Sequence, residues 1–107
     1  MKTSQILIKA RKFMAKGFCK WFAAEDAEGH GINPLDRKAV KWCAGGAVMA
    51  ATLTDSWPWA SDPLNWLTAA AGKDIVTFNN APKRTKAEML EVFDTAIFMA
   101  KLEEAAA

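Results

Sequence analysis

Apolar residues recur every three or four positions near both ends of the chain, and this spacing predicts an amphipathic helix at each end. The first helix starts at a capping residue, Thr3 or Ser4, and buries a face made of Leu7, Ala10 and Met14. The last helix starts at the capping box Thr85-Lys86-Ala87-Glu88. Its buried face comprises Met89, Val92, Phe93, Ala96, Ile97 and Ala100. We expect residues 102–107 to fray, because they offer charge and alanine but little apolar surface to bury.

A second helix is predicted from Asp36 to about Thr52. The turn Asn33-Pro34-Leu35-Asp36 ends in a good N-cap, and apolar residues follow it at helical spacing, namely Ala39, Val40, Cys43, Ala47 and Ala50. Gly45 and Gly46 lie inside this helix, where each costs about 1 kcal/mol relative to alanine. We therefore expect this pair to allow another backbone or a ligand to approach closely.

A third helix is predicted from Ser61 or Asp62, with Pro63 in its first turn, to a stop at Gly72. The run Ile75 to Phe78 is β-branched and aromatic, which predicts a short strand with a partner in residues 17–24. These elements predict a mostly α fold, a four-helix compact single domain over residues 1–107 with a small two-stranded element.

Composition narrows the class of protein. The chain has 107 residues, 51% hydrophobic, and a net charge of only +2, which is typical of a globular protein. No apolar run approaches the roughly 20 residues that cross a bilayer, and lysines and arginines interrupt the N-terminus where a secretion signal would lie. We therefore expect no membrane association and a cytoplasmic protein. Two cysteines and one histidine are too few for a zinc site, and we expect neither a metal nor a cofactor.

The order of short motifs resembles a family of short bacterial and phage proteins of unassigned function. The family pattern is Gly-Trp-Cys, an acidic glycine turn, Cys-Ala-x-Gly-Ala, Trp-Asn-Asp, a proline and Arg-Thr. In this chain the corresponding residues are Gly17-Phe18-Cys19, Glu25 to Gly29, Cys43 to Ala47, Phe78-Asn79-Asn80, Pro82 and Arg84-Thr85. Phe18 replaces the usual tryptophan and Asn80 the usual aspartate, which puts any role for a carboxylate there in doubt. The resemblance implies a mostly helical fold and supplies no activity, and it suggests a phage or prophage origin.

Trp57-Pro58-Trp59 is the main candidate for an interaction site. Proline and turn-forming residues place it in a loop, where rigid aromatic side chains are typical binding anchors. The alternative is that both rings cover the small core. We expect a non-catalytic protein that docks on a host or phage macromolecule, through this loop together with the last helix. Self-association through the same apolar surface is a further possibility.

A small-ligand site is the second hypothesis. It would lie between the predicted second helix and the Asn79-Asn80 turn, close to Trp42, Cys43 and Gly46, and would bind a nucleotide or another metabolite. Asparagines in turns also bond their own backbone, so a purely structural role is the alternative.

Two further hypotheses have less support. A thiol-dependent enzyme would use Cys43 or Cys19, but no orienting partner can be identified for either, and His30 lies in a loop. The first 20 residues hold six basic residues and no acid, yet no aromatic platform is interleaved with them, so nucleic-acid binding is not favoured. The acidic turn at residues 25–28 is expected to be solvated rather than catalytic.

Overall fold

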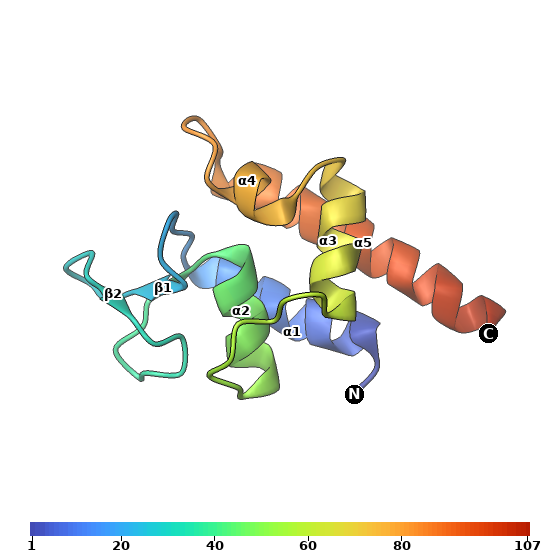
Figure 1. The fold of residues 1–107 in the computed structure, drawn as a ribbon, viewed down its shortest axis with the longest axis horizontal. Coiled ribbons are helices and arrows are strands. Elements are labelled where there is room, and N and C mark those ends of the chain that lie inside the picture. Colours follow the sequence, from blue (N-terminus) through green and yellow to red (C-terminus); the bar gives the residue numbers. More distant parts are fainter.

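Helices at the two ends of the chain pack against each other and enclose most of the core. The computed structural model describes all residues, 1–107. Helix α1 (Thr3–Lys16) packs against α2 (Ala44–Thr52) and α5 (Lys86–Ala106). Helix α3 (Asp62–Ala71) crosses α5, and the single-turn helix α4 (Ile75–Asn79) lies against α2 and α3 (Figure 1). The shared core includes Leu7, Met14, Val48, Leu67, Met89 and Phe93, all at most 2% exposed.

A small antiparallel sheet lies beside the C-terminal end of α1 and the start of α2. Its strands are β1 (Ala24–Glu25), β2 (Gly31–Ile32) and β3 (Lys41–Trp42), in the order β2-β1-β3. Ala24 pairs with Ile32 on one side and with Trp42 on the other. An additional bridge joins Phe18 to Trp42, which ties the end of α1 to the sheet.

The predicted class, mostly α with a minor β element, is confirmed, but the predicted numbers of elements are wrong. The structure has five helices rather than four and three strands rather than two. The predicted cap of the first helix at Thr3 or Ser4 is wrong, because Lys2 is the N-cap of α1 and Gln5 completes its capping box. The capping signals of α3 and α5 are confirmed. The hydroxyl of Ser61 caps α3, Gly72 ends it with φ of 76°, and Thr85 and Glu88 form the predicted capping box of α5. No helix of the structure is both long enough and apolar enough to cross a bilayer.

The predicted helix from Asp36 to Thr52 is wrong in its first half. Residues 36–40 form turns and Lys41–Trp42 is a strand, so α2 starts only at Ala44. The amide of Val40 donates to Glu25 O and that of Trp42 to Gly17 O, at 2.9 and 3.0 Å. These bonds to distant segments satisfy the backbone that a helix would have satisfied locally, and therefore override the helical spacing of side chains.

The predicted strand from Ile75 to Phe78 is also wrong, because these residues form α4. Asp74 caps this helix by accepting a hydrogen bond from the amide of Thr77, at 3.0 Å. The amide of Ile75 donates to the hydroxyl of Thr68 on α3, at 3.1 Å. Cap and packing outweigh the β propensity of the run, which is weak and depends on context. The segment 17–24 does pair in the sheet, but with β2 and β3.

The C-terminal end is tied to the N-terminal helix. The sequence predicts a frayed end at residues 102–107, whereas α5 continues to Ala106 in the structure. Glu104 accepts hydrogen bonds from the hydroxyl and the amide of Ser4, at 2.6 and 3.1 Å. The two termini therefore lie on the same side of the molecule (Figure 1).

Candidate functional site

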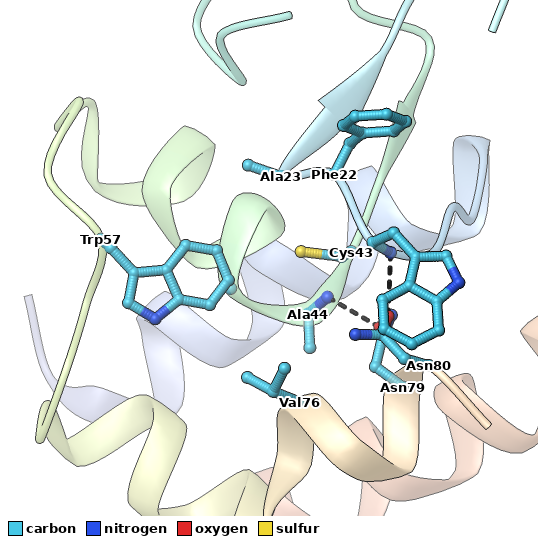
Figure 2. Close-up of a pocket in the computed structure, with 10 residues that line it drawn as sticks. Phe22, Ala23, Cys43, Ala44, Trp57, Val76, Asn79 and Asn80 are labelled. Atoms are coloured by element: carbon cyan, nitrogen blue, oxygen red, sulfur yellow. Dashed lines mark hydrogen bonds between the residues drawn. The ribbon is translucent and has the colours of Figure 1, made fainter. Parts of the chain in front are cut away.

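Three segments that are distant in the sequence meet at the N-terminus of α2 and form a small pocket. They are the chain before β1, the loop after α2 and the end of α4. We call this cavity the aromatic pocket, because three of its ten lining residues are large aromatic side chains. The residues are Trp21, Phe22, Ala23, Cys43, Ala44, Gly45, Trp57, Val76, Asn79 and Asn80. Figure 2 shows Trp57 on one side of Ala44 and the Asn79–Asn80 pair on the other.

Asn79 holds the floor of the pocket together. Its side chain is 2% exposed, and its Oδ1 accepts a hydrogen bond from the amide of Ala44, at 3.0 Å. Its Nδ2 donates to Cys19 O at 3.2 Å and to Asn80 Oδ1 at 3.0 Å. The buried side-chain amide of Asn79 therefore connects α4 to α2 and to the segment after α1. Because its oxygen and its nitrogen are both hydrogen-bonded, we assign it a structural role.

Asn80 connects this support to the exposed rim. Its Oδ1 also accepts a hydrogen bond from the amide of Trp21, at 2.9 Å. Its Nδ2 has no partner within the chain, and the residue lines the pocket, so this amide can donate to an incoming acceptor. Lys20 fixes the loop that follows Asn80, because its ammonium donates to the carbonyls of Ala81 and Pro82, at 2.6 and 3.0 Å.

Trp21 is an exposed aromatic residue in a strained backbone conformation. Its φ is 74°, and 77% of it is exposed to solvent. A bulky residue in the left-handed region costs about 1–2 kcal/mol, and such residues persist where the surroundings hold them in place. Here the bond to Asn80 and the clamp formed by Lys20 provide that restraint. Strain of this kind is concentrated at functional sites.

Trp57 forms the opposite wall and lies on Gly45. A Cβ added to Gly45 would overlap the six-membered part of the indole, so only glycine lets the ring lie this close to α2. The Nε1 atom of Trp57 is buried without a hydrogen-bond partner. An unpaired buried donor costs roughly 1–3 kcal/mol. A bound group whose acceptor reached Nε1 would remove this cost.

Trp59 extends this wall into solvent. Its ring centroid lies 5.6 Å from that of Trp57, with the ring planes tilted by 55°, and the residue is 74% exposed. Phe22, at the other edge of the pocket, is 49% exposed and packs against Gly31 of β2. Aromatic surface therefore continues from the pocket onto the outside of the molecule.

The two cysteines are free and buried. Cys43 is not in the middle of a helix as predicted but at the N-cap of α2, where its Sγ accepts a hydrogen bond from the amide of Gly46 at 3.3 Å. Burial nevertheless raises the pKa of Cys43, and it raises the pKa of Cys19 to about 12. A higher pKa leaves less thiolate at neutral pH, which works against a nucleophilic role for either thiol.

The acidic turn between β1 and β2 stabilises the hairpin backbone. Asp26 Oδ1 accepts hydrogen bonds from the amides of His30 and Glu28, at 2.9 and 3.0 Å. The bond from the amide of His30 is the main reason that the pKa of Asp26 is lowered. No group of three or more His, Cys, Asp or Glu side chains in the structure is arranged to hold a metal ion.

The structure brings together residues from both site hypotheses. Cys43, Asn79 and Asn80 from the ligand hypothesis line the same pocket as Trp57 from the docking loop. Trp42 and Gly46 do not line it: the Nε1 of Trp42 donates to Pro34 O elsewhere, and Gly46 packs against Ala23 O. Pro58 and Trp59 lie outside the lining, and so does every residue of α5.

Sequence reasoning missed Trp21, Phe22 and Val76. The aromatic pair Trp21-Phe22, beside Lys20, does not belong to any amphipathic pattern. This was the one feature of the sequence that could have indicated their place in the pocket. Val76 could not be placed, because the predicted strand put it in the wrong element.

Comparison with known proteins places the chain in a family but supplies no activity. No curated protein and no solved structure matches it. A family model described as a family of unknown function, DUF6197, matches residues 1–98 and so includes every residue of the aromatic pocket. An unassigned family is also what the order of motifs suggested. The chain belongs to this family, DUF6197.

Proposed function

We propose that the protein is a non-catalytic binding protein that docks on a partner macromolecule through the aromatic pocket, with Trp21, Trp57 and Trp59 as its anchors. The observation that carries this proposal is the strained, 77% exposed Trp21, which Asn80 holds at the rim of the pocket. Rigid aromatic side chains lose little entropy on binding and contribute most of the affinity at many interfaces.

The size of the pocket favours a macromolecule over a free nucleotide. Its interior is about 60 Å³, whereas ligand pockets usually enclose about 300–1,000 Å³. Such a cavity accommodates one small group, such as part of a side chain. The exposed rings of Trp21 and Trp59 lie outside it, where the rest of a partner surface would contact them.

The hydrogen-bond donors around the aromatic pocket indicate which chemical group would enter it. Asn80 offers a free amide donor, and a shift of Trp57 would offer its unpaired Nε1. A carbonyl or carboxamide oxygen beside an apolar group matches both donors and the aromatic walls. If the protein is phage or prophage encoded, the partner would be a host or phage protein in the cytoplasm, and a second copy of the chain would be the simplest alternative partner.

Site-specific photo-crosslinking tests this proposal. A photoreactive phenylalanine analogue placed at position 21 or 59 should crosslink one partner in the cells that carry the gene. The same analogue at Phe98, which is 63% exposed on α5 and outside the pocket, is the matched control. Crosslinks that are equally abundant at position 98, or absent at both 21 and 59, would count against docking through the pocket.

Alanine variants supply the quantitative test. Trp21→Ala and Trp59→Ala should each weaken binding to the crosslinked partner by about 2 kcal/mol or more, roughly thirtyfold, while Phe98→Ala leaves it unchanged. Circular dichroism should be the same for all three variants, because these side chains are exposed. Sedimentation of the purified chain then decides whether the partner is a second copy.

A small-ligand binding protein is the second candidate, supported by the convergence of Cys43, Asn79 and Asn80 on one cavity. The volume restricts the ligand to a small polar metabolite or fragment. Binding to the native state alone raises the melting temperature, so a thermal-shift screen of amides and carboxylic acids should reveal stabilisers. Their effect should disappear in Asn80→Ala, and a screen without stabilisers would remove this candidate.

A further inference from the structure

A second groove, on a different part of the surface, combines lysines with an apolar floor. It lies between α1 and the C-terminal end of α2 and has a volume of about 360 Å³. We call it the lysine groove. Its lining consists of Lys9, Lys12, Phe13, Lys16, Ala50, Ala51 and Leu53. It shares no residue with the aromatic pocket, and its volume is within the range of ordinary binding sites.

The positive charge of the lysine groove is not neutralised within the chain. None of Lys9, Lys12 and Lys16 takes part in an ion pair, and α1 contains no acidic residue. Arg11, on the same helix, is paired with Asp94 at 2.6 Å. Unpaired lysines are common on protein surfaces. Here, however, three of them lie beside one apolar floor, so the groove suits a ligand that carries both negative charge and apolar groups.

Leu53 is the exposed part of the apolar floor, whereas Ala50 and Ala51 are buried. Leu53 is 81% exposed, because it ends α2 in the left-handed conformation with φ of 55° and points away from the core. Phe13 lies beneath Lys16, whose ammonium is 5.3 Å from the ring centroid. The groove continues toward Leu35 and Arg37. Asp36, the one carboxylate in that extension, accepts a hydrogen bond from the amide of Lys38 at 2.8 Å.

We infer that the lysine groove binds an acidic amphipathic helix of a partner protein. Lys9, Lys12 and Lys16 repeat every three or four residues along about 10 Å of helix axis, and carboxylates on a second helix repeat with the same spacing. A small anion would reach only one or two of these lysines. An apolar side chain on the flank of the acidic stripe would cover Leu53 and Ala50. Nucleic acid would match the charge but leave the apolar floor uncovered.

A designed peptide tests the inference directly. The probe is a capped peptide of about 14 residues, or four helical turns, with glutamate along one stripe, leucine beside it and alanine elsewhere. Its control has glutamine in place of every glutamate. Titration followed by two-dimensional amide NMR should show shifts confined to residues 9–16 and 50–53 for the acidic peptide, and much weaker binding of the control.

Charge reversal supplies the matched variants. Lys9→Glu, Lys12→Glu and Lys16→Glu together should weaken binding at least about tenfold, because three attractions become repulsions. Lys73→Glu, Lys83→Glu and Lys101→Glu change the net charge equally at exposed lysines outside the groove, and should leave binding nearly unchanged. Leu53→Ser should weaken binding without altering its dependence on salt. If the charge-reversed variant does not fold, the three groove lysines can be changed to glutamine instead, which removes their charge without introducing repulsion.

Three results would overturn the inference: no shifts in the groove, equal binding of the glutamine peptide, or equal binding of a single-stranded oligonucleotide, which would indicate an unselective anionic contact. Trp21→Ala should not change peptide binding, because Trp21 is outside the groove. Failure of the lysine groove can therefore be distinguished from failure of the aromatic pocket.

Discussion

Trp21 has a strained backbone conformation and an indole that is mostly exposed to solvent. Its left-handed backbone is unfavourable for any residue with a Cβ, and its indole gains little from burial because 77% of the residue is in solvent. The hydrogen bond that its backbone amide donates to Asn80 Oδ1 holds it in place. Stability alone would select glycine at this position, so the tryptophan side chain itself is the feature that requires a functional explanation.

This reasoning predicts an order of stability for two variants. Trp21→Gly and Trp21→Ala both remove the indole, but only glycine adopts φ of 74° without strain. We expect Trp21→Gly to be more stable than Trp21→Ala by about 1 kcal/mol in urea denaturation. Equal stabilities would mean that the backbone at residue 21 relaxes when the indole is removed, and would weaken the argument from strain.

The N-terminus of α2 is the element on which the site is assembled. Gly45 and Gly46 lie in its first turn and are both buried, with different neighbours. Gly46 faces the backbone carbonyl of Ala23, whereas Gly45 faces the ring of Trp57. The sequence predicted that this pair allows a close approach. The structure identifies one approaching group as the backbone before β1 and the other as an aromatic side chain.

The two glycines should respond differently to alanine. In Gly46→Ala the new Cβ overlaps backbone that the sheet holds in place, so we expect a loss of about 3 kcal/mol in the free energy of unfolding. In Gly45→Ala the Trp57 ring can swing outward, and alanine regains up to about 1 kcal/mol of helix propensity, so the loss should be much smaller. Urea denaturation gives both values. Similar losses would show that the Trp57 ring is as firmly held as the backbone.

Over the whole molecule, contacts between distant segments hold the fold together at both ends. At one end, Asn79 joins the segment after α1, the start of α2 and α4. At the other, Ser4 near the N-terminus binds Glu104 near the C-terminus. Arg11 of α1 also pairs with Asp94 of α5. The aromatic pocket is at the first of these ends, where the sheet and α4 meet α2.

The clasp between Ser4 and Glu104 should depend on pH. The bonds from Ser4 lower the pKa of Glu104, so the clasp is fully present above the ordinary carboxyl pKa of 4.5 and is lost as the pH falls through the lowered value. We expect faster amide hydrogen exchange at residues 100–106 at acidic pH, after correction for the intrinsic rate. Glu104→Gln should show the faster exchange at neutral pH as well. Exchange that does not depend on pH in the unmodified chain would contradict this assignment.

Sequence alone determined several features that act within one helical turn. The cap at Ser61, the stop at Gly72 and the capping box from Thr85 to Glu88 are where they were predicted, because each joins a side chain or a permissive backbone to its immediate neighbours. The periodic buried faces of α1 and α5 were also predicted. The mostly helical class followed from them. Trp57, Cys43, Asn79 and Asn80, which the sequence analysis singled out, line one pocket in the structure.

Tertiary structure decided whatever depended on a partner far along the chain. Val40, Trp42 and Cys43 lie outside the helix predicted for them, because their amides donate to the carbonyls of Glu25, Gly17 and Ala23. The run from Ile75 is helical in part because its first amide donates to the hydroxyl of Thr68 on α3. Trp21 joined the site for the same reason, through Asn80, which is 59 residues away. Spacing along a chain encodes local hydrogen bonds and buried faces, whereas which distant backbone groups satisfy one another is settled only when the core closes.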